Sequence, residues 1–397
     1  MQERNITKFQ IGLIIPWLLV SIGAVDLGLR LVPRDTASRF GVDRVTLMTP
    51  HGSRWRGVFE PNLSIKLVGC GRIAEAANLP SLCVPQEAEY HTDEWNHMNE
   101  ASAHLPGASS VLLVGDSFGV FSESGFENDF ARLLAREMGQ GLYNASRPGL
   151  GPVSSGAIMD LLDRLQMKRG TVVFETSDTS HPPRADPPDQ DGARRHFWGL
   201  LSEQSLALPR YSFYKLTRQD GAFYETQKWL HKLQNDLILP HADPYWNSSL
   251  IEKLRDGEEI GLLPGDRTSQ PEENTNFDPE WERYWLDLSV VLHSRGVQLV
   301  VVLIPRKFIV YGPLLANPAP QADVKASYWR SLENSLRGDG IPVVNMTDPF
   351  RQAANEALGH GELIYPRDES HWGFKAREMA AERVAQELRC VLSADSR

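Results

Sequence analysis

From about residue 110 to the C-terminus, strand-like and helix-like segments alternate along the chain, and this alternation restricts the fold more than any other feature. Each short run of apolar, β-branched residues is followed by a segment with apolar residues at helical spacing. That order is typical of a parallel sheet whose crossover helices cover both faces. We therefore predict an α/β fold, a three-layer αβα sandwich with a five-stranded parallel sheet. The strands are expected at 111–115, 141–146, 171–176, 297–305 and 341–346.

The alternation is interrupted at about 180–275 by the segment "HPPRADPPDQDG" and a stretch rich in Trp and Tyr. We interpret this part as an insertion that forms a lobe or lid within a domain spanning 110–397. Residues 34–109 are rich in turn formers with short extended pieces, which predicts a small β-containing N-terminal region. The helices of the domain are expected at 126–138, 154–167, 279–296, 322–337 and 373–388.

Residues 9–25 form a stretch of 17 residues without a charge, preceded by Arg4 and Lys8. This length is short for a membrane-spanning helix and also fits the apolar part of a signal peptide. Because apolar residues continue through "DLGLRLV", we favour a membrane anchor or signal segment at 1–33 that stays uncleaved. The rest of the chain would then lie in the periplasm, anchored to the inner membrane. Secretion after signal cleavage is one alternative, and a buried cytosolic helix is another.

Charge and cysteine content exclude several classes of protein. The net charge is -10 and no basic run occurs, which argues against a nucleic-acid partner. The three cysteines, Cys70, Cys83 and Cys390, have no zinc-site spacing, so we expect neither a metal nor another cofactor. Cys70 and Cys83 are able to form a disulfide if the domain is exported, and two separate thiols remain an equal alternative.

One serine stands where a parallel sheet places reactive groups. Ser117 directly follows the predicted strand 111–115, at its carboxyl end. A serine hydroxyl needs a base to take its proton and a third group to orient that base. The segment "YPRDESHWGFKA" places Asp368 three residues before His371, just ahead of the last predicted helix. We predict that Ser117 is a nucleophile, His371 its general base and Asp368 the group that orients His371.

A nucleophilic serine also requires donors for an oxyanion. The backbone N–H of Ser117 is one candidate. The segment "NASRPGLG" after the second strand supplies Gly149 and Gly151, whose missing side chains let backbone amides approach a substrate oxygen. A simple turn at these glycines is the alternative.

Together, "GDSF", "NASRPG" and "DESHW" resemble the SGNH, or GDSL-type, hydrolase superfamily over roughly 110–395. The resemblance implies that Ser117 is the nucleophile, His371 the general acid and base, Asp368 the orienting group and Gly149 an oxyanion donor. Within the superfamily, the chain is similar to bacterial alginate O-acetyltransferase-like envelope proteins. The residues that carry this second similarity are Pro305, Lys307, Val310, Tyr311 and the pair His371–Trp372.

Two features depart from these families. In the alginate proteins the Asp/His motif precedes the serine, whereas here it follows, as in ordinary esterases of the superfamily. The superfamily also has an Asn after the third strand that donates to the oxyanion. Here "VVFETSDTS" has no Asn, and Glu175 and Ser177 lie near that place. We expect Asp116, Glu175 and Trp372 to be candidate substrate-binding residues.

These observations predict an exported serine acyl-ester enzyme, either an O-acetyltransferase or an acetylesterase. Its expected substrate is a cell-envelope or secreted polysaccharide, or an acylated small molecule. For a transferase, a membrane acyl-carrying O-acyltransferase is the expected donor, because acetyl-CoA is cytosolic. The alternative is a non-catalytic carbohydrate-binding or assembly component of a polysaccharide modification or export complex, which the missing Asn favours.

Overall fold

The structure is a computed structural model, and the chain divides into two compact units. The first unit, Met1–Thr46 with Pro187–Asp243, lies outside the described residues except for Ser21. All that follows concerns the second unit, Leu47–Asp186 with Pro244–Arg397. Its described residues are 81–95, 97–120, 125–147, 154–177, 250–263 and 279–395, with short pieces at 48–49, 58–59, 62, 64–71 and 73–74.

The predicted anchor at 1–33 and most of the predicted insertion therefore lie outside the described residues. Within the described part of the chain, none of the helices has the length and apolar character needed to cross a membrane.

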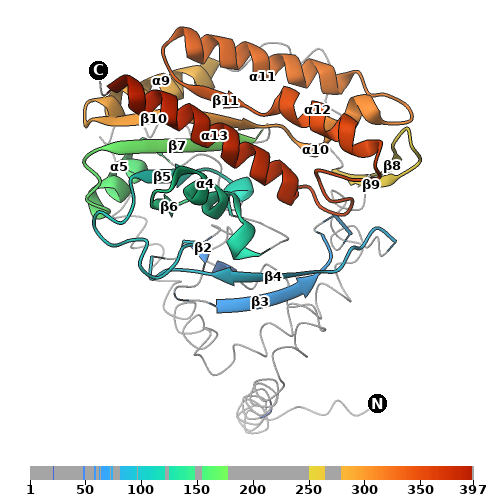
Figure 1. Ribbon diagram of the computed structural model, residues 1–397, viewed down its shortest axis with the longest axis horizontal. Coiled ribbons are helices and arrows are strands. Elements are labelled where there is room, and N and C mark those ends of the chain that lie inside the picture. Colours follow the sequence, from blue (N-terminus) through green and yellow to red (C-terminus); the bar gives the residue numbers. More distant parts are fainter. Residues whose placement is uncertain are drawn as a thin grey trace, which may run out of the picture. The chain divides into compact units, whose positions relative to one another are not determined.

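A five-stranded parallel sheet forms the centre of the second unit, which confirms the predicted α/β fold (Figure 1). The longest pairing joins β7 to β10 from Gly170↔Val297 to Ser177↔Ile304. All five expected strands are present. In their order across the sheet they are β11 (Val343–Asn345), β10 (Val297–Ile304), β7 (Gly170–Ser177), β5 (Val111–Val114) and β6 (Leu142–Asn144).

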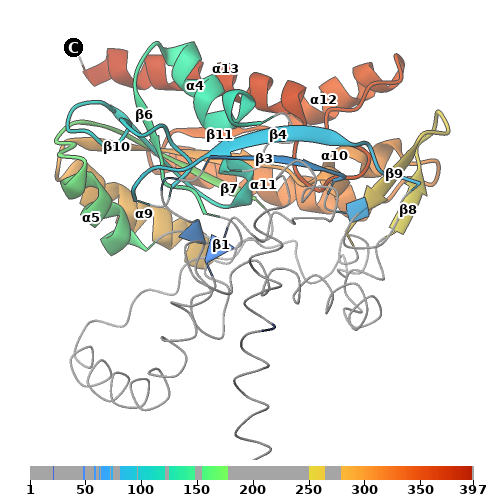
Figure 2. The ribbon, with the colours of Figure 1, turned by 90° about the horizontal axis from the view of Figure 1, so that it is seen from below.

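Helices cover both faces of the sheet, as Figure 2 shows. Strand residues alternate between the two layers: Val300 and Val302 pack on one side, and Val301 and Leu303 on the other. On the first side lie α4 (Phe130–Met138), α12 (Thr347–Leu358) and α13 (Phe374–Asp395). On the second lie α5 (Ser155–Arg164), α9 (Pro279–His293) and α11 (Gln321–Gly338).

Shorter elements surround this sandwich. Antiparallel pairs are formed by β1 (Met48–Thr49) with β2 (Val58–Phe59), by β3 (Ser64–Gly69) with β4 (Gln86–His91), and by β8 (Leu250–Lys253) with β9 (Glu259–Leu262). The single-turn elements are α10 (Lys307–Tyr311) and the 3-10 helices η2 (Ser117–Gly119), η3 (Phe126–Asn128) and η5 (Gly312–Leu314). The sequence did not predict α10, which has five residues, or α12, which has twelve and begins two residues after the end of β11.

The strand order places Ser117 at a distinctive position. From β5 the chain crosses to β6 on one side and then to β7 on the other side, so the direction of winding reverses at β5. In open α/β sheets, ligands bind at the carboxyl ends of the strands where this reversal occurs. Ser117 begins η2 three residues beyond the end of β5 and lies at this switch point.

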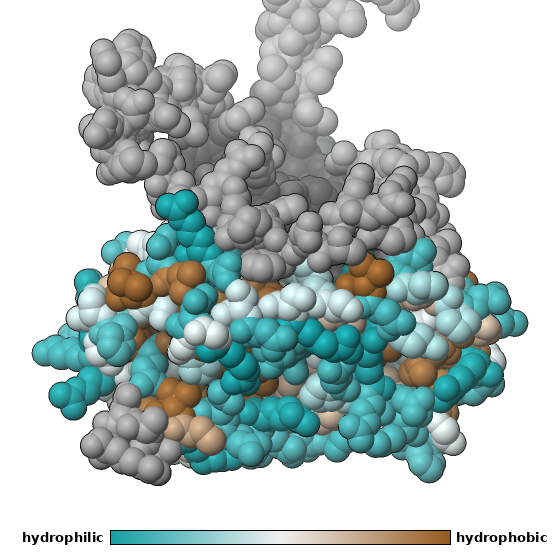
Figure 3. Space-filling view, turned by 90° about the horizontal axis from the view of Figure 1, so that it is seen from above, coloured by the Kyte–Doolittle hydropathy of each residue, from teal (hydrophilic) through white to brown (hydrophobic). Residues whose placement is uncertain are grey.

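The described residues on one face of the second unit show how polar and apolar side chains are distributed. In the face drawn in Figure 3, hydrophobic residues form separate small groups among hydrophilic ones. Such scattered groups are ordinary for a protein surface.

Candidate active site

The turn after β5 holds Ser117 through contacts with its near neighbours. The Asp116 Oδ1 accepts a hydrogen bond from the Phe118 N–H at 2.9 Å and so caps η2. Asn144 at the end of β6 donates from Nδ2 to the Gly119 carbonyl at 2.8 Å. Gly115 has no space for a side chain, because a Cβ there would collide with Glu175. The turn is therefore fixed on both sides by adjacent strands.

His371 lies directly against Ser117. Its Nε2 is 2.8 Å from the Ser117 Oγ, and its Nδ1 is 2.8 Å from the Glu369 Oε1. His371 is 3% exposed and Glu369 is 0% exposed. A carboxylate only accepts hydrogen bonds, so Nδ1 carries the proton and Nε2 is left to accept from the serine hydroxyl. Ser117, His371 and Glu369 thus form a directed hydrogen-bonded chain.

The prediction that Asp368 orients His371 is corrected by this geometry. The Asp368 Oδ2 accepts hydrogen bonds from the Gly71 N–H at 2.7 Å and the Val84 N–H at 2.9 Å. Its Oδ1 has no hydrogen-bond partner in the structure described here. The sequence contained both carboxylates, in "DESH", but the donors that draw Asp368 away belong to a distant loop. Glu369, two residues before His371, takes the place that the three-residue spacing had assigned to Asp368.

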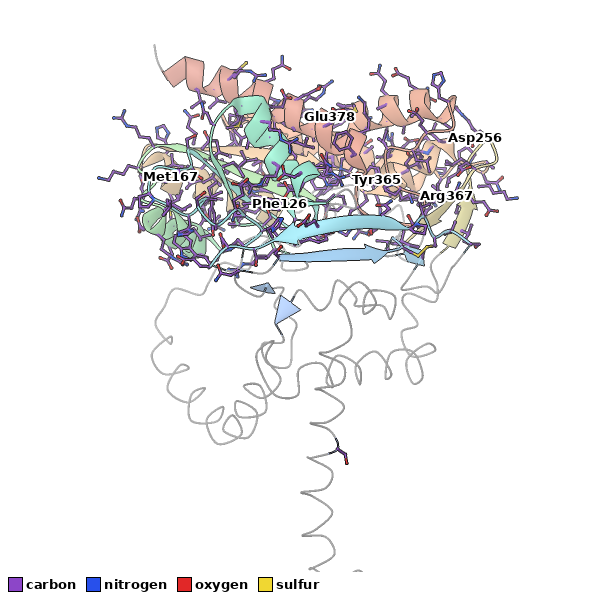
Figure 4. All side chains as sticks on the ribbon, turned by 60° about the horizontal axis from the view of Figure 1, so that its bottom comes forward. Phe126, Met167, Asp256, Tyr365, Arg367 and Glu378 are labelled. Carbon is purple, nitrogen blue, oxygen red and sulfur yellow. A yellow bond between two sulfur atoms is a disulfide. The ribbon has the colours of Figure 1, made fainter. Side chains whose placement is uncertain are left out.

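The loop that carries His371 is fixed to the segment after β10. The Lys307 ammonium, 3% exposed, donates to the carbonyls of Pro366 at 2.6 Å, Arg367 at 2.9 Å and Glu369 at 3.3 Å. The Tyr311 hydroxyl accepts from the Ile364 N–H at 2.9 Å. Lys307 and Tyr311, which the sequence connected only with a family similarity, thus hold the histidine loop, defined here as residues 364–373. Figure 4 labels Tyr365 and Arg367 on it.

Trp372 is not a substrate-binding residue, contrary to the prediction. It is 0% exposed, and its Nε1 donates to the Phe118 carbonyl at 3.0 Å. Its ring packs on Phe118, Phe130 and Phe350. A polar tip and a large apolar body suit this place, because the residue joins the histidine loop to the serine turn through the core.

The contacts of Asp116 and Glu175 correct the prediction that they bind substrate. Both side chains hold the serine turn against β7. Asp116 uses its Oδ2 to accept from the Ser177 hydroxyl at 2.7 Å, in addition to capping η2. Glu175 is 0% exposed and accepts from the Asp116 N–H at 3.1 Å. Burial, with the nearby charge of Asp116, raises the pKa of Glu175 well above its usual value. The Glu175 carboxylate lies against Gly115 and Gly119 of the serine turn, where it is fully buried.

The predicted oxyanion donors are the backbone N–H groups of Ser117, Gly149 and Gly151. Gly149 and Gly151 lie outside the described residues. The Ser117 N–H is at the first position of η2, on the turn described above. Its role as a donor stays a prediction.

A second buried polar cluster lies beside β6 and was missed by sequence reasoning. Tyr143 donates from its hydroxyl to the Asp93 Oδ2 at 2.8 Å and lies 3.0 Å from the His97 Nδ1. The His97 Nε2 lies 3.3 Å from the Arg147 Nη2. Burial, helped by the charge of Arg147, lowers the pKa of His97 to about 4. His97 therefore stays neutral at pH 7 and accepts from Arg147, while its Nδ1–H donates to Tyr143.

Comparisons with known proteins found a family match and similar solved structures. Residues 255–396 match the family described as "SGNH hydrolase-like domain, acetyltransferase AlgX". The resemblance to the SGNH hydrolases is confirmed. A solved structure from Slackia heliotrinireducens, which carries a provisional SGNH hydrolase name, is similar at 12% identity with a TM-score of 0.33. The alignment covers 71% of this chain and 99% of that one. No curated protein matches the chain.

The match begins at residue 255 and so includes the histidine loop but not Ser117. The part of the chain that matches this family in sequence is therefore roughly its C-terminal third, from β9 to α13. Ser117 joins this part through the sheet and through the contact with His371.

Proposed function

We propose that the protein is a serine-dependent acyl-ester enzyme, an O-acetyltransferase or acetylesterase of the SGNH type. The observation that carries this proposal is the hydrogen-bonded chain from Ser117 through His371 to Glu369, with 2.8 Å at each step. A hydroxyl, an imidazole and a buried carboxylate in this order are the parts that an activated serine needs.

The proposed reaction has two halves. In the first, His371 Nε2 takes the Ser117 proton while Oγ attacks the carbonyl carbon of an acetyl ester. The bond from that carbon to the donor oxygen breaks, and the donor oxygen leaves with the proton from His371. In the second half, His371 takes a proton from water or a sugar hydroxyl, whose oxygen attacks the acetyl-serine. Ser117 then leaves as the hydroxyl after taking that proton back from His371.

Glu369 has a defined part in both halves. Its carboxylate keeps the proton of His371 on Nδ1, so that Nε2 is always the basic atom. It also stabilises the imidazolium that forms each time His371 holds a second proton. Because Glu369 is fully buried, this interaction is weakly screened by water.

The developing oxyanion needs donors that replace the Asn of the family pattern. We assign the Ser117 N–H as one donor and the Gly149 N–H as the other. Glu175 stands near the place of the missing Asn, but it lies under the serine turn and accepts from Asp116 there. Backbone amides are sufficient donors in other serine enzymes, so the loss of the Asn is compatible with catalysis.

The substrate class and location are also proposals. An acetylated or acetyl-accepting polysaccharide of the cell envelope is favoured by the match to an acetyltransferase family. Export is favoured by the disulfide between Cys70 and Cys83, since such bonds persist mainly in oxidising compartments. With an N-terminal anchor, the acyl donor would be a membrane acyl-carrying partner.

The test is acetyl release from p-nitrophenyl acetate by the full chain in detergent, with oligosaccharide acceptors followed by mass spectrometry. Ser117→Ala is compared with Ser146→Ala, which removes another buried hydroxyl next to the same turn. Release that needs Ser117 supports an enzyme, and acetylated oligosaccharide selects the transferase. Equal release by wild type and Ser117→Ala would contradict the proposal and favour the non-catalytic alternative.

A further inference from the structure

The loop between β3 and β4 is closed by a disulfide at its base. Cys70 directly follows β3, Cys83 lies just before β4, and their Cα atoms are 5.0 Å apart. We call residues 70–84 the disulfide loop. Figure 4 shows the yellow sulfur–sulfur bond at the end of β3, on the same side of the molecule as the labelled Arg367. The crosslink holds both ends of the loop at a fixed separation, whatever the residues between them do.

Asp368 is the residue that the disulfide loop holds. Its Oδ2 accepts from Gly71 on one side of the disulfide and from Val84 on the other, at 2.7 and 2.9 Å. Its backbone carbonyl accepts from Ile73 at 2.9 Å and from Ala74 at 3.3 Å. Four N–H groups of one loop thus converge on a single residue that is 0% exposed. A carboxylate that accepts from several backbone N–H groups is strongly held.

Close packing adds to these bonds. Gly71 lies so near the Asp368 backbone that a Cβ would collide with the Asp368 carbonyl and carboxyl groups. Only glycine permits this approach. At Gly71, the disulfide loop therefore packs directly against the backbone of the histidine loop.

The opposite side of the histidine loop is held by other parts of the domain. Lys307 binds three of its carbonyls, and the Gly261 N–H of β9 donates to the Arg367 carbonyl at 2.8 Å. Glu369, the partner of His371, directly follows Asp368. A shift of Asp368 would consequently move the Glu369 carboxylate relative to the imidazole.

We propose that Asp368 is a positioning residue: it fixes Glu369 and His371 against Ser117 by binding the loop that the Cys70–Cys83 disulfide closes. The inference rests on the proposed function, because it concerns the alignment of the same three residues. It differs from the family pattern, in which the Asp three residues before the His would contact the imidazole itself. In this protein the Asp acts through the backbone of a covalently closed loop.

The first arm of the test compares Asp368→Ala with Asp368→Asn. The Asn carbonyl oxygen can still accept both N–H groups, so Asp368→Asn should keep kcat within about threefold of wild type. Asp368→Ala removes the acceptor, and we expect kcat to fall about 10- to 100-fold with little change in KM, since a misplacement of about 1 Å is enough for such a loss. An Asp368→Asn loss as large as that of Glu369→Gln would overturn the proposal, because it would make Asp368 the orienting group.

The second arm asks whether Asp368 acts through the disulfide loop. Cys70→Ser with Cys83→Ser should lower kcat in the same way, whereas Cys390→Ser, at the exposed third cysteine, should not. Adding Asp368→Ala to the double cysteine variant should cost little more than Asp368→Ala alone, since both changes remove one interaction. Fully multiplicative losses would overturn the proposal, because they would show two independent effects.

A readout without turnover separates this inference from the proposed function. Amide hydrogen exchange across residues 364–373 should rise in Asp368→Ala and in the double cysteine variant, and stay near wild type in Asp368→Asn. If neither the wild type nor any variant shows Ser117-dependent turnover, the enzyme proposal fails. The exchange pattern described above would still support the positioning role of Asp368. Unchanged exchange in all three variants would refute the positioning role itself.

Discussion

The serine turn and the histidine loop meet through the hydrogen bonds His371–Ser117 and Trp372–Phe118 but are built in different ways. The turn is held by Asp116 two residues from its partner, and by Asn144 and Glu175 on the two strands next to β5. The histidine loop is held from far away: Lys307 lies 59 to 62 residues from the carbonyls it binds, and Asp368 binds Gly71 across 297 residues. The serine turn, one half of the site, is positioned by neighbouring strands of the sheet. The histidine loop, the other half, is positioned by contacts between residues far apart in the chain.

The largest expected effect comes from the serine turn. Ser117→Ala should lower kcat by at least about 10⁴-fold, as for other activated serines, with stability near that of wild type. Ser146→Ala, at the neighbouring buried hydroxyl, is the control and should keep most of the activity. Initial rates with an acetyl ester and a thermal melt measure both. A Ser117→Ala rate close to wild type would show that the turn does not supply the nucleophile.

The stability of the histidine loop should depend strongly on Lys307. Lys307→Met removes three hydrogen bonds from a buried ammonium to carbonyls of the histidine loop, so we expect a loss of about 2–4 kcal/mol in the free energy of unfolding. Turnover should fall as well. Lys375→Met is the matched control, because this lysine is exposed and forms a surface ion pair with Glu378 at 3.2 Å; it should change stability by less than about 0.5 kcal/mol. Chemical denaturation measures the free energy of unfolding of both variants. Equal losses in that free energy would contradict the role of Lys307.

The cluster beside β6 gives a prediction on pH. The folded protein holds the pKa of His97 at about 4, below the usual 6.5, so the unfolded chain binds the extra proton first as the pH falls. Stability should therefore be lost as the pH drops from about 6.5 to about 4, by at most about 3 kcal/mol from this group. In His97→Gln this contribution is absent. Chemical denaturation across that pH range tests the role of His97, with His293→Gln as a control at an exposed histidine. If the free energy of unfolding changed with pH in the same way for wild type and His97→Gln, the prediction would be refuted.

The smallest effect on stability and kcat is expected at Trp372, whose side chain contacts both halves of the site. Trp372→Phe removes the bond to the Phe118 carbonyl and should cost about 1–2 kcal/mol, with kcat lowered by a few-fold. Trp285→Phe, at an equally buried site on the other face of the sheet, should cost similar stability and leave kcat unchanged. Denaturation and initial rates of the two variants make the comparison. Equal kcat values in both would show that Trp372 contributes to the core alone.

The contrast between the locally built serine turn and the histidine loop, which distant residues hold, explains what could be predicted from the sequence. The five strands and the placement of Ser117 follow from local apolar patterns, and the structure bears them out. His371 could be found because a His with an Asp three residues before it, just ahead of the last helix, is an uncommon combination.

The choice between Asp368 and Glu369 could not be made from the sequence. It depends on N–H groups of Gly71 and Val84, which are brought to Asp368 by a disulfide that the sequence left open. Trp372 was misjudged for a similar reason. Its surroundings, Phe130 and Phe350, lie in helices on either side of it in space but distant in the chain.

The measurement that tests the account most directly is the pH profile of kcat/KM for Glu369→Gln beside Asp368→Asn. We expect Glu369→Gln to lose on the order of 10⁴-fold, since the imidazole would lose its partner carboxylate and its fixed tautomer. Asp368→Asn should retain a profile close to that of wild type. The reverse result, with Asp368→Asn inactive and Glu369→Gln active, would contradict the chain from Ser117 through His371 to Glu369.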